Sequence, residues 1–217
     1  MIEQNFEQMR RAMVVSQLRT TGVSDARVVA AMGDVPRERF VSGDNARLAY
    51  ADMALPIGPI GRGRALNPPM VTGRLLTEAR VGGGENILVV GAATGYVVAL
   101  LERLGASVVA VEDDPDLAAV GKAAVPGATW VNGPAAQGSA KGAPYSLIYV
   151  DGAVEDIPAA LVDQLSDGGR LVGAVIDQGV TRLVSGVRAG KGFGLKAFAD
   201  ADAAPLPGFA KPAAFTF

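Results

Sequence analysis

Small residues form a turn at Gly91-Ala92-Ala93-Thr94-Gly95, between an apolar run and a helical pattern. Because these residues carry little or no side chain, a ligand could approach the backbone closely there. The helix that begins at Tyr96 would offer free N–H groups to a carboxylate or phosphate. The Gly-x-x-x-Gly spacing differs from the Gly-x-Gly-x-x-Gly pattern of dinucleotide sites, so it disfavours NAD and a nicotinamide oxidoreductase. Alone, the turn is also compatible with a purely structural tight turn.

A carboxylate follows the next apolar run. Glu112 comes about 20 residues beyond the glycine turn, where nucleoside sites place the acid that accepts the ribose hydroxyls. Glu112 also opens an acidic loop, Glu112-Asp113-Asp114, so a solvated surface acid remains the alternative. Taken together, the turn and Glu112 indicate a nucleoside pocket better than either does separately.

A second acid, Asp151, stands before Gly152 at the end of the apolar run 146–150. Ligands of open α/β sheets bind beyond the carboxyl ends of the strands, so Asp151 is expected to point toward the same crevice. An Asp in a strand-to-loop turn more often forms a cap or an Asx-turn, and that alternative stays open.

Apolar runs and helical patterns alternate around these residues and must position them. The expected helices cover 6–21, a segment that begins at Ser24 or Asp25, 70–80, 96–104, 116–124 and 157–166. The expected strands cover 87–90, 107–111, 129–131, 145–150, 170–176 and 214–217. Loops rich in Gly, Pro or Ala are expected at 55–69 and 201–214. This alternation predicts an α/β fold with a doubly wound, mostly parallel sheet that is covered on both faces.

The composition narrows the chemistry. The chain has 217 residues, 49% of them hydrophobic, which is enough for one sizeable core. It contains no cysteine and no histidine, so disulfide frameworks, Cys/His zinc sites, thiol nucleophiles and Ser-His-Asp triads are excluded. We expect no metal site, although ligation by carboxylates alone stays open. Group transfer that depends on positioning and needs no strong base fits this inventory best.

Charge and hydropathy bear on the cellular location and the partners of the protein. The net charge of -2 gives no electrostatic argument for a nucleic-acid or acidic-membrane partner. The first residues lack the basic and apolar regions of a signal peptide. The apolar runs have strand length and are too short to span a bilayer. We therefore expect a cytoplasmic protein that binds neither nucleic acid nor membranes.

Blocks spread over nearly the whole chain resemble the protein-L-isoaspartate O-methyltransferase family. In order, these blocks are Met13-Val14-Val15-Ser16-Gln17-Leu18, Gly22-Val23, Val29-Ala30-Ala31-Met32, Val35-Pro36-Arg37-Glu38-Arg39-Phe40-Val41, Ala49-Tyr50-Ala51-Asp52, Leu55-Pro56-Ile57-Gly58, Gly95-Tyr96, Val111-Glu112, Ala143-Pro144-Tyr145, Gln164-Leu165, Gly168-Gly169-Arg170-Leu171-Val172 and Pro207-Gly208-Phe209. A chance match of this many ordered blocks is very improbable.

The resemblance implies a repair enzyme that uses S-adenosylmethionine to methylate the carboxyl group of L-isoaspartyl residues in damaged proteins or peptides. Its nucleophile, a carboxylate, is already ionised at neutral pH, so neither His nor Cys is needed. It also implies an S-adenosylmethionine-dependent methyltransferase (Rossmann-like) core over 81–217, with an N-terminal helical and loop subdomain over 1–80. Asn67 is the expected catalytic contact with the acceptor. The expected cofactor-binding residues are Gly91, Ala93, Thr94, Gly95, Tyr96, Glu112, Asn132 and Asp151.

The chain departs from the family pattern at positions expected to touch ligands. Val89 stands where the family has an acid, and Ala93 where it has the second glycine of the turn. Asn132-Gly133-Pro134 replaces an Asp-Gly pair, and Ala65-Leu66-Asn67 replaces a Thr-Ile-Ser segment. These departures support a second hypothesis, a divergent paralogue that keeps the fold but has weakened or lost S-adenosylmethionine binding and is non-catalytic or repurposed.

Overall fold

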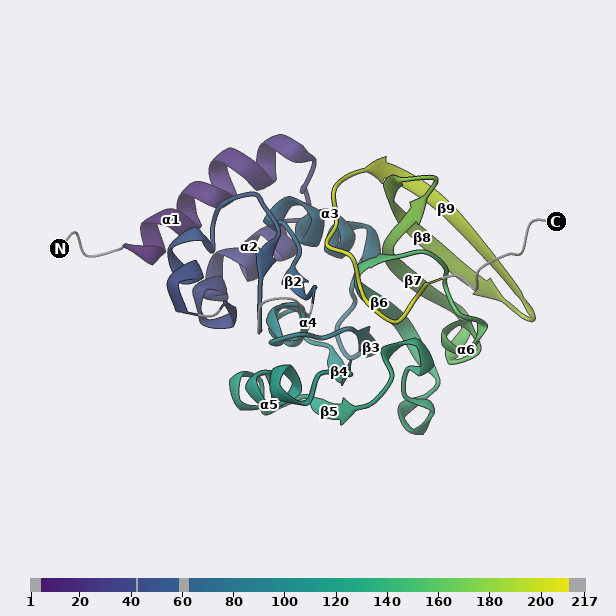
Figure 1. The fold of residues 1–217 in the computed structure, drawn as a ribbon. Helices are drawn as coiled ribbons and strands as arrows, with labels where there is room; N and C mark the ends of the chain where they lie inside the picture. The colour runs from purple at the N-terminus through teal and green to yellow at the C-terminus, as the bar shows by residue number, and fades with distance from the viewer. Residues whose placement is uncertain (1–4, 42, 59–62, 211–217) are drawn as a thin grey trace.

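A seven-stranded sheet forms the centre of the protein in the computed structural model, which describes residues 5–41, 43–58 and 63–210 (Figure 1). The sheet order is β5-β4-β3-β6-β7-β8-β9. Its strands are β3 (Asn86–Val90), β4 (Ser107–Glu112), β5 (Thr129–Asn132), β6 (Tyr145–Val154), β7 (Leu165–Asp177), β8 (Val180–Ala189) and β9 (Gly192–Asp200). The neighbouring strands β5, β4, β3, β6 and β7 pair in parallel. Strand β8 is antiparallel to both of its neighbours, β7 and β9. The expected α/β fold with a mostly parallel sheet is therefore confirmed.

The central strand shows why these apolar runs become strands. Successive side chains of a strand point to opposite faces of the sheet. Ile87 and Val89 accordingly lie in one core cluster, whereas Leu88 and Val90 lie in another, and all four are 0% exposed. A strand buried on both faces reads as an unbroken apolar run, as this one does.

Helices and short helical turns surround the sheet. They are α1 (Phe6–Met13), η1 (Val14–Leu18), η2 (Arg19–Thr21), α2 (Ala26–Asp34), η3 (Arg37–Phe40), η4 (Gly43–Leu48), α3 (Pro69–Ala79), α4 (Tyr96–Arg103), α5 (Pro115–Ala124), η5 (Ala135–Gln137), η6 (Ala140–Gly142) and α6 (Ala159–Val162). Helices α3 to α6 pack against its strands, and the N-terminal helices pack on α3 and α4. Asp25 caps α2 by accepting a 2.8 Å hydrogen bond from the Arg27 N–H. Of the two expected start residues, Ser24 and Asp25, the second is therefore the cap. In the described part of the chain, no helix is long and apolar enough to cross a membrane.

Three expectations about the elements need correction or lie outside the described residues, and one hairpin was not expected at all. The helix expected at 157–166 is confined to α6, because Leu165 already pairs with Tyr145 in the sheet. The hairpin of β8 and β9 is not predicted by the apolar pattern, since many of its side chains are exposed. The expected loop at 55–69 contains a two-stranded pair, β1 (Leu55–Pro56) and β2 (Ala65–Leu66). The strand expected at 214–217 lies outside the described residues.

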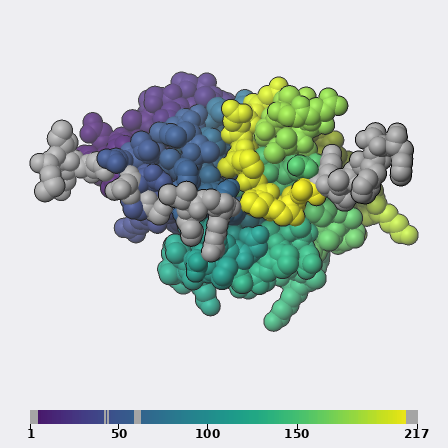
Figure 2. All heavy atoms as spheres, in the orientation of Figure 1, coloured from purple at the N-terminus to yellow at the C-terminus, as the bar shows by residue number. Residues whose placement is uncertain are grey.

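The strand order places a ligand site beside β3. The chain runs from β3 to β4 on one side and later returns to β6 on the other, so the order reverses between these neighbours. Ligands of such sheets bind beyond the carboxyl ends of the strands at this switch point. The chain after β9 returns to this end of the sheet, where Pro205 forms a bridge with Ala153 of β6. Figure 2 shows this C-terminal segment (yellow) running between the N-terminal helices and the β8–β9 hairpin.

Candidate functional site at the carboxyl ends of β3, β4 and β6

The glycine-rich turn after β3 has a backbone that few residues tolerate. Gly91, Ala93 and Gly95 have φ angles of 73°, 52° and 94°, in the left-handed region. A Cβ at Gly91 would lie 2.6 Å from Leu206 Cδ1, so a side chain there would force Leu206 to move. The hydroxyl of Thr94 donates a 2.6 Å hydrogen bond to the Phe40 carbonyl of η3. The turn is therefore packed from two sides by distant parts of the chain.

Glu112, the last residue of β4, meets this turn. Its side chain is 0% exposed, and its Oε2 accepts hydrogen bonds of 2.6 Å from the Ala93 N–H and of 2.6 Å from Arg64 Nη2. Its Oε1 accepts from the Asp114 N–H at 3.1 Å. Burial raises the pKa of Glu112, and the Arg64 charge opposes that rise. The alternative of a solvated surface acid is wrong.

Asp151 belongs to a second buried network at the end of the sheet. Its Oδ1 accepts a 2.8 Å hydrogen bond from Asn67 Nδ2, and Asn67 Oδ1 accepts one of 2.8 Å from the Ala204 N–H. Arg37 Nη2 donates to the Asn67 carbonyl at 2.7 Å. Burial raises the pKa of Asp151 to about 6. Strand β6 continues to Val154, so the alternative of an Asp in a strand-to-loop turn is wrong.

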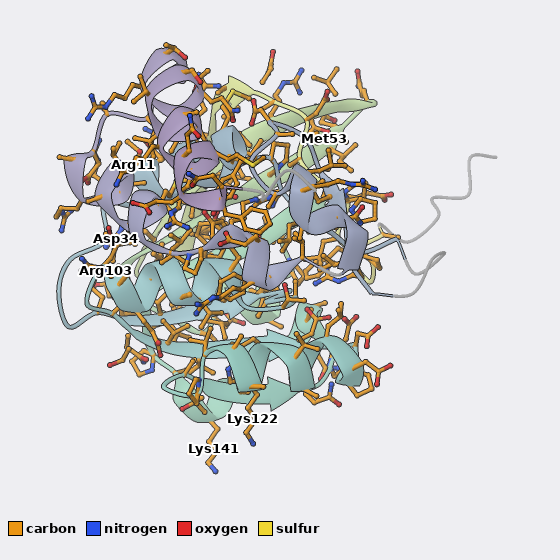
Figure 3. The ribbon with its side chains drawn as sticks, turned by 90° about the vertical axis from the view of Figure 1, so that its left-hand side faces the viewer. Arg11, Asp34, Met53, Arg103, Lys122 and Lys141 are labelled. Atoms are coloured by element: carbon orange, nitrogen blue, oxygen red, sulfur yellow. The ribbon has the colours of Figure 1, made fainter. Side chains whose placement is uncertain are left out.

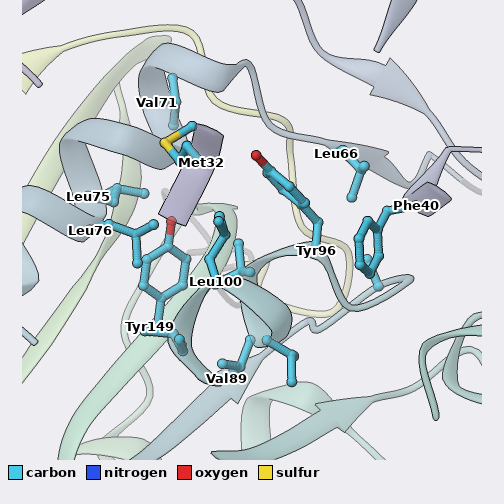
Figure 4. Close-up of a cluster of buried hydrophobic side chains, with 14 of the residues drawn as sticks. Met32, Phe40, Leu66, Val71, Leu75, Leu76, Val89, Tyr96, Leu100 and Tyr149 are labelled. Carbon is cyan, nitrogen blue, oxygen red and sulfur yellow. The ribbon is translucent and has the colours of Figure 1, made fainter. Parts of the chain in front are cut away.

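Tyr96, the first residue of α4, lies inside the protein between aromatic and cationic partners. Its ring centroid is 5.5 Å from that of Phe40 (Figure 4). Arg37 Cζ lies 4.8 Å from the Tyr96 centroid. The Tyr96 hydroxyl and Arg37 Nη1 are buried without a hydrogen-bond partner in the described residues. Tyr96, which was expected to contact the cofactor, is thus only 1% exposed, and it packs between the turn and η3.

Asn132, at the end of β5, lies at the exposed edge of this arrangement. Its Nδ2 donates to the main-chain carbonyls of Glu112 at 3.0 Å and Asp113 at 3.4 Å. It therefore supports the backbone that carries Glu112 and stays apart from the buried networks. In contrast, Val89 is 0% exposed within the apolar core, so a packed strand end explains this departure from the family pattern.

Sequence reasoning missed two arginines of this region. Arg37 is 0% exposed and Arg64 is 6% exposed, which is rare for charged side chains unless they are paired. Arg37 lies within a block that matches the family, and Arg64 lies in the loop rich in Gly and Pro. Their positions give no periodic signal, because each contacts residues far away in the sequence.

The arrangement suits a small ligand with hydroxyl and charged groups. The glycine turn precedes the N-terminus of α4; the buried carboxylate of Glu112 ends β4, and that of Asp151 lies within β6, on the other side of β3. We find no group of acidic side chains that could hold a metal ion among the residues the structure describes. The chemistry available here is hydrogen bonding and ion pairing from pre-positioned groups.

Comparison with known proteins identifies the family to which the whole chain is similar. The model of the protein-L-isoaspartate(D-aspartate) O-methyltransferase family matches residues 9–192. A protein-L-isoaspartate O-methyltransferase of Methanoculleus marisnigri is 39% identical over 171 residues, which cover 76% of each chain. A relative with the same name from Herpetosiphon aurantiacus is 31% identical over 208 residues, 94% of this chain and 92% of that one.

Solved structures show the same fold. A protein-L-isoaspartate O-methyltransferase superposes with a TM-score of 0.80 at 20% identity, covering 94% of this chain and 67% of that chain. A Plasmodium falciparum protein, solved in complex with S-adenosyl-L-homocysteine, gives 0.77 at 16% identity, covering 95% and 100%. The comparisons lend no support to a non-catalytic paralogue. From the family match and the 39% identity, the chain belongs to the protein-L-isoaspartate(D-aspartate) O-methyltransferase family.

Proposed function

We propose that this protein is an S-adenosylmethionine-dependent O-methyltransferase that acts on the carboxyl group of L-isoaspartyl residues. The family match over residues 9–192 supports the activity. The observation that carries the proposal is the 2.6 Å hydrogen bond from the Ala93 N–H to Glu112. It joins the glycine turn and the ribose-type acid at the switch point of the sheet, where a nucleoside cofactor would need both.

The residues present fit this cofactor in part. Glu112 offers a carboxylate for the ribose hydroxyls, and the turn Gly91–Gly95 offers main-chain N–H groups at the start of α4. The Asn132 side chain is hydrogen-bonded to the Glu112 backbone, and the Val89 side chain packs in the apolar core. Cofactor recognition therefore depends on Glu112 and on the turn. When bound, S-adenosylmethionine supplies a methyl group on positively charged sulfur.

The chain needs no base for this reaction. Its acceptor is a carboxylate, which is ionised at neutral pH and can act as a nucleophile directly. The complete absence of His and Cys is compatible with that requirement. The contribution of the protein is to orient the reactants and to exclude water, which lowers the barrier without proton transfer.

Asn67 is proposed as a positioning residue near the acceptor. Its side-chain amide links Asp151 of β6 to the Ala204 N–H of the C-terminal segment, and its carbonyl accepts from Arg37. This bridge supports a role in fixing the relative positions of three elements. The proposed acceptors are proteins and peptides that carry isoaspartate, and the proposed location is the cytoplasm.

A methylation assay tests the proposal. The purified protein is incubated with S-adenosylmethionine labelled in its methyl group and with an isoaspartyl peptide or the same peptide containing normal aspartate. We expect base-labile label in the isoaspartyl peptide alone. Glu112→Gln should lower the rate strongly through weaker cofactor binding, whereas Glu102→Gln, at a partly exposed position of α4, should retain it.

Two outcomes would overturn the proposal. A folded protein that labels neither peptide, and that gives no heat with S-adenosylhomocysteine in calorimetry, would favour the non-catalytic paralogue. Equal labelling of both peptides would show that the acceptor is a carboxyl group of another kind.

A further inference from the structure

Arg64 occupies the carboxylate that the cofactor needs. Its Nη2 lies 2.6 Å from Glu112 Oε2 and 3.2 Å from the Gly91 carbonyl. Both acceptors belong to the proposed cofactor site, one to the ribose acid and one to the glycine turn. The guanidinium and the acid are almost completely buried, with side-chain exposures of 5% and 0%.

The hydrogen-bonding capacity of Glu112 shows that this contact excludes a ribose. A carboxylate offers about four acceptor positions, two on each oxygen. On Oε2 these are taken by Arg64 and by the Ala93 N–H, and on Oε1 one is taken by the Asp114 N–H. At most one position is left, and two ribose hydroxyls need two. The main-chain donors are fixed in the turn and the strand end, so Arg64 is the donor that can leave.

The Arg64 contact is incomplete, which favours exchange. Its Nε is buried without a hydrogen-bond partner among the described residues, and such an orphaned donor weakens the closed arrangement. Its main chain is held independently, because the Arg64 carbonyl accepts a 3.0 Å hydrogen bond from the Ile57 N–H. The exchange therefore concerns the side chain.

We propose that Arg64 sets the cofactor affinity of this enzyme by competing with the ribose hydroxyls for Glu112. The nucleoside would bind only to molecules in which the Arg64 side chain has left the carboxylate. The inference rests on the proposed function, because it assumes a nucleoside at Glu112. If the Arg64 side chain is bound to Glu112 in about nine-tenths of the molecules or more, the apparent cofactor affinity is weakened about tenfold or more.

Calorimetric titration with S-adenosylhomocysteine tests the competition. Arg64→Ala should bind about tenfold tighter or more, since the competing population is gone. The matched control is Arg103→Ala, which removes an arginine that pairs with Asp34 at the surface, at 2.7 Å (Figure 3). This control should bind as the unaltered protein does. Unchanged or weaker binding by Arg64→Ala would overturn the inference.

A second measurement avoids the risk that Arg64→Ala does not fold. In the unaltered protein with ¹⁵N-labelled arginine, the Arg64 Nε–H is buried and should exchange slowly with water. Adding S-adenosylhomocysteine should make this signal exchange fast, and an unchanged signal at saturation would contradict the displacement. The Arg64→Gln variant keeps a polar side chain but loses the charge, and it should also bind S-adenosylhomocysteine more tightly than the unaltered protein.

The outcomes separate this inference from the proposed function. If the unaltered protein and the Arg64 variants all fail to bind S-adenosylhomocysteine, the cofactor assignment itself fails. If all bind with one affinity, and Glu112→Gln abolishes binding, the cofactor site stands and the competition by Arg64 is wrong.

Discussion

Asp151 should make the stability of the protein depend on pH in the mildly acidic range. Burial raises the pKa of this carboxyl from 3.8 to about 6, whereas its contact with Asn67 and the charges of Arg64 and Arg37 act against the rise. Among the described residues, the buried Tyr149 also interacts electrostatically with Asp151. Below the unfolded pKa both states hold the proton, so the group contributes nothing there.

The magnitude and sign follow from proton binding. As pH rises from 3.8 to about 6, the unfolded chain releases its proton while the folded protein keeps it, so the free energy of unfolding falls. A pKa difference of about two corresponds to about 3 kcal/mol, fully expressed above the folded pKa. Asp151→Asn imitates the protonated carboxyl and cannot titrate. Its stability relative to the unaltered protein should therefore rise by about 3 kcal/mol between about pH 3 and pH 7.

Urea unfolding followed by circular dichroism at a series of pH values measures this difference. Other titrating groups are present in both proteins, so subtracting one curve from the other removes most of their contribution. Asp163→Asn, at an exposed position, is the matched control for loss of one carboxylate and should show no comparable step. A difference between Asp151→Asn and the unaltered protein that is constant with pH, or that falls as pH rises, would refute the reasoning.

Three substitutions test the packing around the site by chemical unfolding. Gly91→Ala should destabilise by about 2–4 kcal/mol, from left-handed strain and contact with Leu206, and Leu206→Ala in the same protein should relieve the contact part. Val89→Glu should cost about 3–5 kcal/mol as a buried unpaired charge, against about 1–3 kcal/mol for Val89→Thr; equal losses would contradict that cause. Asn67→Ala should cost about 2–5 kcal/mol, because it leaves Asp151 and the Ala204 N–H without their partner; a loss below about 1 kcal/mol would show that the bridge is not structural.

The central strands could be predicted from the sequence because local rules determine them. A parallel strand buried on both faces must be apolar, and 87–90 and 108–111 show this directly. Glu112 could be predicted because its distance from the turn is set by one helix and one strand. The hairpin of β8 and β9 has alternating and partly exposed side chains with several glycines, so its pattern resembles a loop.

The partners of the site residues could not be predicted, because they are separated widely along the chain. Arg64 reaches Glu112 across 48 positions, and Asn67 reaches Asp151 across 84 and Ala204 across 137. No periodicity or spacing encodes such contacts, which arise only when the loop before α3 packs against the carboxyl ends of the strands. Sequence reasoning therefore identified the acids and missed the arginine that neutralises one of them.

The departures from the family pattern and the position of Arg64 have a joint consequence. Val89 and Asn132 carry no carboxylate to offer a nucleoside; Val89 packs in the apolar core, and Asn132 bonds the Glu112 backbone. At the proposed cofactor site, affinity would then depend on Glu112 more heavily than in a site with several acids. Hydrogen bonds to charged groups contribute about 1.5–3 kcal/mol each, so whatever occupies Glu112 controls a large part of the binding free energy. Under the proposed competition, one buried arginine is enough to tune the affinity of the whole site, and replacing Arg64 should have a larger effect than supplying a new acid at Val89.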